Sequence, residues 1–506
     1  MKKSILKVGA IAMAGTMALG LVACGGKKDP NPNNPNNPNV NLSLYEMADV
    51  LARGVDAHYV TRNDEEVAFG FYYNALEGGL DGYANNYEGA ALIGMANRMY
   101  DVSEGENKEY YKKLLDDYIS ALDYYDGAGW ITSTHGKRYW EHLYGVTRAR
   151  EPYKAAVEGR SMVYDDLMWI ARYFIEGYRY SGYTETSYLE KAEHLIKCCL
   201  DGWDSTQDGA GGITWGPAYS TKHACSNGPI LSVLGGLAEV YKGKDDALVT
   251  EDDTVYVAQT FGQGNVEWEN WVGKTKYEYY SYWLETIYDW CWTNLRAGDY
   301  TYIDLRGDSS SVVSDEKAPG NEYLKFAGNL DSGSATKYTY NTGSVLSGAA
   351  WLYRLTGKEQ YLTQGRQMAE GAFHRFVKTV KAQDGTEHQM YECTASLLFN
   401  SVLLQGYAEL ADAIKVVAAD KDETVKEELN NIIKNELNTY VGVFKSSITY
   451  GFQNHLLNRT LPQNYIQGWL YGNETMDTKK ESKDASATPE MLAIIVQYEK
   501  AHGEIK

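Results

Sequence analysis

Apolar residues in the body of the chain recur at helical spacing. Between Leu167 and Phe174 they fall on every third or fourth position, and residues 345–352 and 398–407 repeat this spacing. Such spacing gathers apolar side chains on one face of an α-helix. No run of alternating polar and apolar residues competes with these segments, so the sequence predicts an all-α fold.

Three segments share a helical-hairpin pattern. Residues 94–118, 171–196 and 349–372 each run from a helix through a polar turn with glycine into a helix that opens on tyrosine. Helical pairs that recur along a chain bury their apolar faces on their neighbours in a stacked or closed array. Residues 244–253 and 307–333 interrupt the spacing, and we expect these insertions on one rim of a closed helical barrel.

The first 23 residues have the features of a bacterial signal sequence. Three lysines precede an apolar run at residues 8–23 that is too short to cross a membrane comfortably. The run ends in Leu-Val-Ala-Cys-Gly at residues 21–25, which resembles the bacterial lipobox, where cleavage precedes a cysteine whose thiol then carries lipid. We therefore predict a signal peptide at residues 1–23 and lipidation at Cys24, which places the protein on a membrane.

Residues 24–41 are expected to form a lipid-anchored linker. The stretch at residues 25–39 is rich in proline and asparagine and holds almost no apolar residue. Such a segment stays extended and solvated. The folded domain is then expected to span residues 42–506, attached to the bacterial cell envelope at the outer membrane or the cell surface.

The charge and the aromatic content of the chain limit the kinds of molecule that the protein can bind. Lys and Arg total 48 against 68 Asp and Glu, a formal net charge of −20 without a basic cluster in the body, so nucleic acid is excluded as a partner. The 43 Tyr and 12 Trp outnumber the 10 Phe. Rings that carry a polar group suit an amphipathic ligand such as a sugar, or they fill long helix interfaces. Composition alone leaves both explanations open.

The remaining cysteines and the histidines indicate neither a disulfide framework nor a metal site. Beyond Cys24 the number of cysteines is odd, without Cys-x-x-Cys spacing, and the nine His lack paired ligand spacing. We expect buried free thiols, no metal and no cofactor. The five cysteines concerned are Cys198, Cys199, Cys225, Cys291 and Cys393.

A pair of carboxylates stands at the predicted start of a helix, between Tyr164 and Trp169. Asp165 and Asp166 are adjacent there. One explanation is structural, since acids at a helix start pair with free backbone N–H groups and favour the helix dipole. The other is catalytic, because neighbouring carboxylates repel and divide into an ionised and a protonated member, as glycosidic cleavage requires.

Two further motifs combine ligand-binding chemistry with turn chemistry. Glycines at 211–212 allow close approach of backbone to a ligand, an indole supplies a stacking face, and side-chain amides bond hydroxyl groups. The alternative is a glycine turn followed by asparagines that cap helices. The candidate ligand-binding residues are Gly212, Trp215, Lys222, Asn227, Tyr340 and Asn341.

The order of these motifs resembles glycoside hydrolase family 76, the bacterial and fungal α-1,6-mannanases. Tyr-Asp-Asp with a following Trp, Gly-Gly-Ile-x-Trp, Lys-x-Ala-x-Ser-Asn-Gly and Thr-Tyr-Asn-x-Gly occur in that order. The resemblance spans residues 56–498 and is strongest over 163–372. It implies an (α/α)6 barrel and retaining endo-cleavage of α-1,6-mannan backbones by a monomer that binds mannan or mannooligosaccharide.

The same resemblance implies roles for individual residues. Asp165 corresponds to the nucleophile and Asp166 to the general acid/base, with Tyr164, Trp169 and the six residues of the other motifs in contact with substrate. Retention requires carboxyl groups about 5 to 5.5 Å apart, which neighbours with Cα atoms ~3.8 Å apart reach readily. The chain departs from the family pattern at Ile170, Thr214 and His223, so the details of the sugar subsites do not carry over.

Two other functions fit part of the sequence. A non-catalytic glycan-binding outer-membrane lipoprotein would share the signal, the linker and the aromatic content. An exo-acting (α/α)6 glycosidase would share the fold. The aspartate pair in its motif order favours the hydrolase over the binding protein, which has no need of it.

Overall fold

The structure, a computed structural model, describes most of the chain beyond the predicted linker. Cys24, the signal and the linker lie outside the described residues, as does the insertion at 307–333. The described residues are 42–63, 66–74, 80–132, 138–204, 211–217, 219, 221–254, 271–304, 336–381, 385–393, 395–454 and 479–505.

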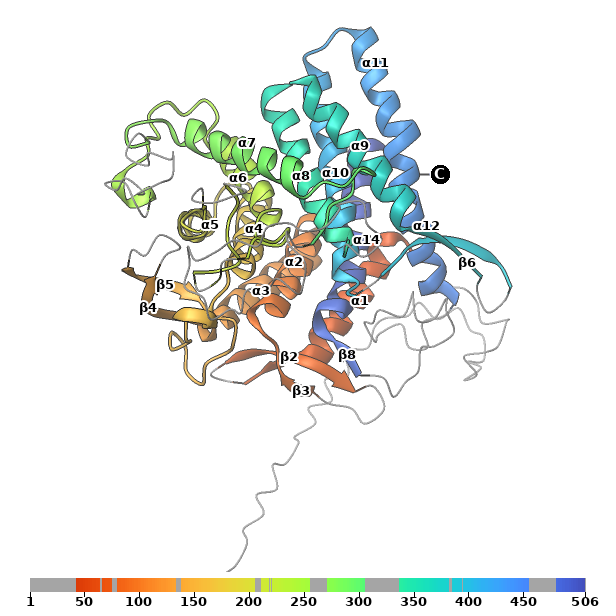
Figure 1. The fold of residues 1–506 in the computed structure, drawn as a ribbon. Helices are drawn as coiled ribbons and strands as arrows, with labels where there is room; N and C mark the ends of the chain where they lie inside the picture. Colours follow the sequence, from red (N-terminus) through yellow and green to blue (C-terminus); the bar gives the residue numbers. More distant parts are fainter. Residues whose placement is uncertain are drawn as a thin grey trace, which may run out of the picture. The chain divides into compact units, whose positions relative to one another are not determined.

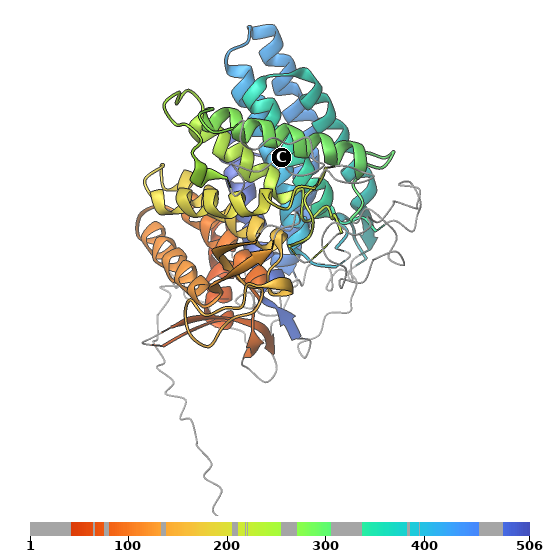
Figure 2. The same cartoon turned by 60° about the vertical axis from the view of Figure 1, so that its left-hand side comes forward.

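Six buried helices form a closed inner ring. Each packs on the next in chain order, and the last packs on the first, so that the ring closes. Figures 1 and 2 show this closure where the blue C-terminal helix lies beside the red and orange N-terminal helices. The ring consists of α2 (Asn86–Val102), α4 (Tyr164–Tyr180), α6 (Pro229–Tyr241), α8 (Thr339–Thr356), α10 (Leu398–Ala419) and α14 (Ser482–His502).

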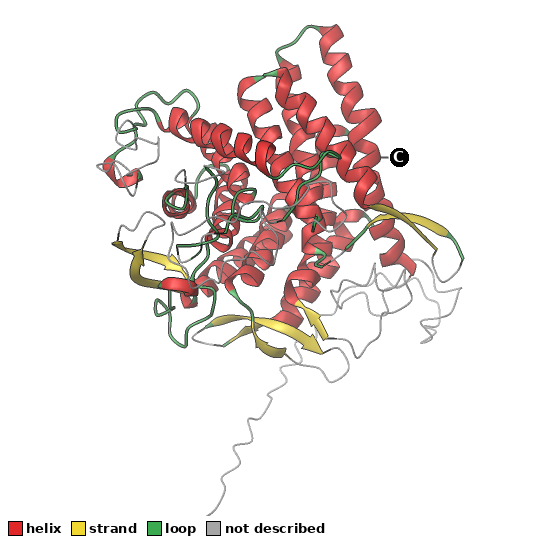
Figure 3. Ribbon diagram, viewed as in Figure 1, coloured by secondary structure: helices red, strands yellow, loops and turns green. Residues whose placement is uncertain are grey.

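A second layer of helices covers the ring (Figure 3). Helix α1 packs on α14 and α2, whereas α3, α5, α7 and α9 each pack on the inner helix that precedes them, and α12 packs on α10 and α14. The outer helices are α1 (Leu44–Tyr59), α3 (Gly105–Ala121), α5 (Thr186–Leu200), α7 (Lys276–Asn294), α9 (Glu359–Phe376) and α12 (Asn438–Asn454), the last preceded by α11 (Glu423–Ile432) and a π-helical turn (Ile433–Leu437).

The two layers follow from different residue patterns. Inner helix α8 buries every residue from Thr339 to Tyr353, as expected of a helix surrounded by protein. Outer helix α3 buries one stripe, from Tyr111 through Leu114 and Leu115 to Tyr118. The predicted all-α (α/α)6 barrel is confirmed.

The three predicted helical hairpins are confirmed as α2–α3, α4–α5 and α8–α9. Their turns rely on glycine in the left-handed region, for example Gly182 with φ +70° and Gly357 with φ +64°. A side chain disfavours that conformation, so glycine ends the inner helix and lets the outer helix start. The periodic apolar residues that predicted these helices, such as Leu167 and Phe174, are buried.

The structure also contains short antiparallel strands, which lie outside the helical segments that the sequence predicts. All lie in connections that lead from an outer helix to the next inner helix, where a few extended residues pair locally. The sheets are β1 (Val60–Arg62), β2 (Val67–Asn74) and β3 (Leu80–Tyr83) in that order, with β8 (Lys479–Glu481) on β2; β4 (Asp126–Thr132) with β5 (Arg138–Tyr144); and β6 (Val377–Lys381) with β7 (Glu387–Tyr391).

Tyrosine fills many of the helix interfaces. Nearly all of the largest fully buried side chains are tyrosines, among them Tyr111 and Tyr118 on α3 and Tyr353 on α8. For these residues the aromatic content reflects packing between helices rather than contact with a ligand. The five cysteines beyond Cys24 are free, and three of them are buried. Across the described residues, no helix has both the length and the apolar character that a membrane span requires.

Close packing of inner helices α8 and α10 depends on Gly343 of α8. A Cβ there would lie 2.6 Å from the Cα of Leu403 and 2.7 Å from the carbonyl oxygen of Val402, both backbone atoms of α10. We expect Gly343→Ala to lower the free energy of unfolding by about 1–3 kcal/mol, as overpacking does. Urea unfolding followed by circular dichroism measures this change.

The matched control is Gly442→Ala on outer helix α12. A Cβ at Gly442 would meet only Ile505, at an ordinary contact distance of 3.4 Å. We expect this variant to be unchanged or more stable by up to about 1 kcal/mol, because alanine favours helix. Equal stability of the two variants would contradict the close packing of α8 on α10.

Candidate active site

The two candidate acids lie in the first turn of inner helix α4. Val163 is the N-cap residue, and no side chain caps this helix. The backbone N–H of Tyr164 donates to the carbonyl oxygen of Trp215 at 2.8 Å, which joins the helix start to the glycine-rich loop. Neither Asp165 nor Asp166 is the N-cap, but both lie in the first turn, and the backbone N–H groups of Asp165 and Asp166 bond the Asp165 carboxylate. The structural explanation therefore holds in part and does not exclude the catalytic one.

Burial raises the pKa of both acids, and to different extents. Asp166 is 8% exposed, and Asp165 is half-buried. Burial raises the pKa of Asp165, while the neighbouring Trp215 indole and Cys225 thiol act in the opposite direction. Burial raises the pKa of Asp166 further, well above its ordinary value, and the negative charges of Asp165 and Glu88 add to the effect. The pair therefore divides into one acid that ionises first and one that retains its proton.

Two residues of α2 that the sequence analysis did not select belong to this site. Asn86 is fully buried and opposes the rise in the pKa of Asp166, whereas Glu88 contributes to it. Glu88 also accepts a hydrogen bond from the Asn85 backbone at 3.0 Å. The feature that could have identified these two residues is their position. Asn86 and Glu88 lie at the start of an inner helix, as the aspartate pair does.

Lys222 and Asn227 hold the glycine-rich loop together. Asn227 is fully buried; its Oδ1 accepts from the Ile213 N–H at 2.7 Å, and its Nδ2 donates to the carbonyls of Ile213 and His223 at 3.0 and 2.9 Å. Lys222 Nζ donates to the carbonyl oxygens of Asp204 and Gly211 at 2.9 and 2.5 Å. Both side chains thus bond to the protein itself and fix the loop's shape.

Gly212 and Trp215 lie on the same glycine-rich loop and pack against aromatic side chains. A Cβ at Gly212 would lie 2.5 Å from the ring of Trp290, so only glycine fits beneath this indole. Trp215 is half-buried, and its ring lies 4.7 Å from that of Tyr219 and 5.1 Å from that of His223. Since Trp215 also lies beside Asp165, it forms an aromatic wall next to the acids.

Tyr340 and Asn341 lie in the first turn of α8. Tyr340 donates to Asp304 Oδ1 at 2.5 Å and packs on Phe399, with ring centroids 4.4 Å apart. Cys225 lies close enough to Tyr340 to add to the rise in its pKa that burial causes. The expectation that Asn341 caps the helix was wrong: Tyr338 is the N-cap residue, and Asn341 is fully buried.

Tyr164 and Trp169 belong to the core. Tyr164 is fully buried, and its ring fills the space over the Cα of Gly202, where a Cβ would lie 2.5 Å away. Trp169 is 5% exposed, with the guanidinium of Arg172 5.2 Å from its ring. Both residues therefore support α4 from inside the protein.

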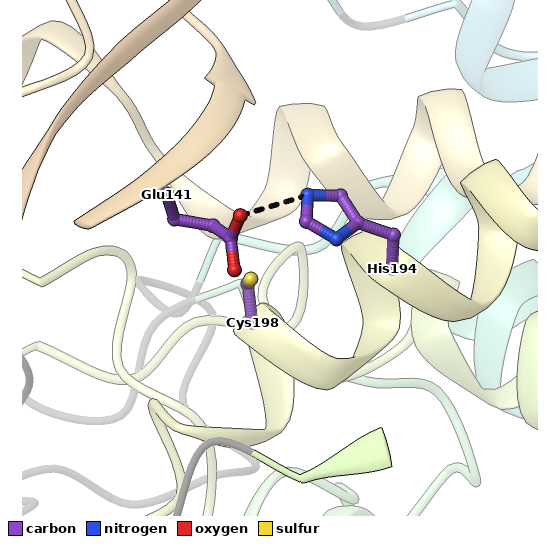
Figure 4. A group of neighbouring side chains, drawn as sticks. All are labelled: Glu141, His194 and Cys198. Carbon is purple, nitrogen blue, oxygen red and sulfur yellow. Dashed lines mark ion pairs between the residues drawn. The ribbon is translucent and has the colours of Figure 1, made fainter. Parts of the chain in front are cut away.

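One group of potential metal ligands was found among the described residues, and it includes neither Asp165 nor Asp166 (Figure 4). Glu141 of β5 lies 3.7 Å from His194 of α5, near the buried thiol of Cys198. Lys197 already pairs with Glu141 at 3.2 Å, and His194 Nε2 donates to the His142 carbonyl at 2.7 Å. Burial raises the pKa of the Cys198 thiol. These donors are occupied in contacts that join β5 to α5.

Comparison with solved structures finds the same fold in several glycoside hydrolases, among them the following three. A family 76 glycoside hydrolase from a bovine Bacteroides thetaiotaomicron strain is 20% identical in sequence, with a TM-score of 0.62. The match covers 91% of this chain and 79% of that protein's chain. A family 76 mannosidase from Bacteroides thetaiotaomicron is 18% identical, with a TM-score of 0.63 and coverages of 91% and 100%.

The third is an α-1,6-mannanase of Salegentibacter sp. HEL1_6, solved with α-1,6-mannotetrose as an inactive variant in which two consecutive aspartates are replaced by alanine. It is 15% identical, with a TM-score of 0.56, covering 90% of this chain and all of its own. At these identities the likenesses establish the fold alone.

Comparison at the level of sequence identifies the family. A search of curated proteins found no match. The sequence profile of glycosyl hydrolase family 76 matches residues 120–249 and 274–442, more than half of the chain, and this range includes Asp165 and Asp166. The chain therefore belongs to glycosyl hydrolase family 76.

Proposed function

We propose that this protein hydrolyses α-1,6-linked mannan backbones by an endo-acting, retaining mechanism. The observation that carries the proposal is the pair of adjacent acids, Asp165 and Asp166, whose pKa values are raised unequally at the start of an inner helix. Membership of the family supports a glycosidase. The substrate is supported by the structurally similar mannanase, which holds α-1,6-mannotetrose and lacks activity without two consecutive aspartates.

Burial distinguishes Asp165 and Asp166 from the other adjacent aspartates among the described residues. The pair at 116–117 lies on outer helix α3. The pairs at 245–246 and 252–253 lie in the connection between α6 and α7, where all but Asp253 are exposed. Only the pair on α4 joins an inner helix to the glycine-rich loop, so we assign catalysis to it.

In the first step, ionised Asp165 attacks the anomeric carbon of the bound sugar. The bond from that carbon to the glycosidic oxygen breaks, and protonated Asp166 gives its proton to the departing oxygen. The part of the chain on the reducing-end side leaves with a free hydroxyl, and the non-reducing part remains as an ester on Asp165. The raised pKa of Asp166 suits the donor, because it keeps the proton available at a pH where Asp165 is ionised.

In the second step, Asp166 acts as a base. Its carboxylate takes a proton from water while the water oxygen attacks the anomeric carbon and the ester bond to Asp165 breaks. Two displacements at the same carbon restore the original α configuration. Asp165 is again ionised and Asp166 again protonated, so the cycle closes without a cofactor.

The surrounding residues divide into ligand contacts and positioning residues. We assign Trp215 as a stacking face beside Asp165, and Gly212, Tyr340 and Asn341 to the walls that contact sugar. Lys222 and Asn227 act through the loop that they hold. We also propose that the protein is a monomer, anchored to the bacterial membrane by lipid at Cys24. It would face outward and cut a polymer that is too large for the cell to import.

Replacing each acid by alanine tests the two roles. We expect Asp165→Ala and Asp166→Ala each to lower the rate of reducing-end release from α-1,6-mannan by at least about 10²–10⁴-fold. With an activated aryl α-1,6-mannobioside, azide is expected to restore turnover: Asp166→Ala then yields an α-glycosyl azide, and Asp165→Ala a β-glycosyl azide. Nuclear magnetic resonance of the product identifies the configuration.

Asp245→Asn is the matched control, because this acid also has an aspartate neighbour but lies exposed in a turn. It is expected to retain wild-type activity. The opposite assignment of the two azides would reverse the roles, and turnover above a tenth of wild type in Asp165→Ala would remove that residue from the mechanism. Release of mannose alone from long mannan would make the enzyme exo-acting.

The rate is expected to follow a bell-shaped curve against pH. It falls at low pH as Asp165 gains a proton and at high pH as Asp166 loses one. Because the negative charge of Glu88 raises the pKa of Asp166, Glu88→Gln should lower that pKa and move the alkaline limb to lower pH, by up to about 1 unit. The pH profile of kcat/KM measures the shift.

The control for this change is Glu106→Gln, an exposed acid on α3. It should leave both limbs in place. Glutamine at position 88 keeps an oxygen to accept from the Asn85 N–H, so the helix start is preserved. An alkaline limb that stays in place or moves to higher pH would show that Asp166 is not the group that titrates there.

A further inference from the structure

Two tryptophans stand exposed on the hairpin of β4 and β5. Trp130 and Trp140 are directly opposite each other across the strands. They are 44% and 53% exposed, and their ring centroids lie 5.5 Å apart. Isolated apolar side chains on a surface are ordinary, but two adjacent exposed indoles form a patch of the kind that marks a binding site.

The protein holds this patch in place before any ligand arrives. The guanidinium of Arg138 lies 4.9 Å from the ring of Trp130. The backbone N–H of Trp130 donates to Glu158 Oε1 at 2.9 Å, and the backbone N–H of Ala155 donates to the carbonyl oxygen of Asp126 at 3.0 Å. These bonds fix β4 on the segment 155–159, so binding orders few side chains and loses little entropy.

A cavity of about 270 Å³ adjoins the tryptophans and has the chemistry of a sugar subsite. Its lining includes Trp130, Thr132, Arg138, Glu158 and Pro217. An indole face and a proline suit the C–H face of a sugar ring, while guanidinium, carboxylate and hydroxyl groups bond its hydroxyls. The cavity is smaller than the roughly 300–1,000 Å³ of a typical ligand pocket, which suits one part of a longer chain.

The loop that carries Trp215 also contributes one residue to the lining of the cavity. Pro217 is two residues from Trp215, which lies beside Asp165. The rings of Tyr219 and Trp215 have centroids 4.7 Å apart, and the guanidinium of Arg160 lies 6.0 Å from the centre of the Tyr219 ring. Arg160 follows the segment that bonds Trp130. A row of aromatic and polar groups therefore leads from the acids to the exposed tryptophans.

We propose that Trp130 and Trp140, with the adjoining cavity, form an accessory subsite that binds sugar units of a polysaccharide chain remote from the bond that is cut. This inference rests on the proposed function, since it names the same substrate class. Such a subsite contributes only when the substrate is long enough to reach from the acids to the hairpin. It therefore favours polymers over short oligosaccharides.

The test compares long and short substrates in the Trp130→Ala/Trp140→Ala double variant of the full folded domain. On long α-1,6-mannan we expect kcat/KM to fall about 10-fold, a loss of about 1.4 kcal/mol of binding to the two indoles. On α-1,6-mannotriose we expect no change. Trp130→Phe/Trp140→Phe, which keeps two rings, should retain most of the activity on mannan. Tyr183→Ala, at an exposed ring on the α4–α5 turn, is the control and should match wild type on both substrates.

Binding without hydrolysis separates this inference from the proposed function. In native gels that contain α-1,6-mannan, the Asp165→Ala variant should be retarded, and adding the two alanines should remove most of the retardation. If wild type hydrolyses mannan but the double variant hydrolyses long and short substrates as wild type does, the subsite is refuted while the function stands.

Two other outcomes would also overturn the subsite. Equal loss on long and short substrates would show a general effect on the fold. Self-association in sedimentation that the double variant abolishes, with mannan hydrolysis unchanged, would assign the tryptophans to contact with a second copy of the chain.

Discussion

Closure of the inner ring is the constraint on which the rest of the structure depends. Helix α14 packs between α10 and α2, so the six inner helices surround one axis and nearly every residue of a helix such as α8 is buried. The connections from outer to inner helices then bring the starts of α2 and α4 together. Groups far apart in sequence come into contact there: Asn86 acts on Asp166, and Cys225 acts on Asp165.

This placement sets two electrostatic effects against each other. The start of a helix favours negative charge and tends to lower the pKa of an acid there, yet burial raises the pKa of both Asp165 and Asp166. Acids with a raised pKa in the folded state bind protons more tightly there, so their contribution to stability falls as pH rises through that pKa. The site therefore reduces stability at neutral pH, and the packing of the barrel compensates.

Much of the fold could be predicted from the sequence because it depends on patterns of neighbouring residues. Helical spacing and turn glycines such as Gly182 and Gly357 located three hairpins. The strands escaped prediction because a few extended residues pair only after the helices place them. At the site, the motif order located Asp165 and Asp166, but not Asn86 or Glu88, which reach the acids from another helix. Residue type alone also did not reveal that Asn227 and Lys222 bond to their own loop.

The position of α14 also matters for the acids on α4. Among the described helices, this one packs on both α10 and α2, so without residues 482–502 the ring would lack one side. Helix α2 carries Asn86 and Glu88, which act on Asp166. A change that detaches α14 would therefore remove a support of α2, far along the sequence from the acids themselves.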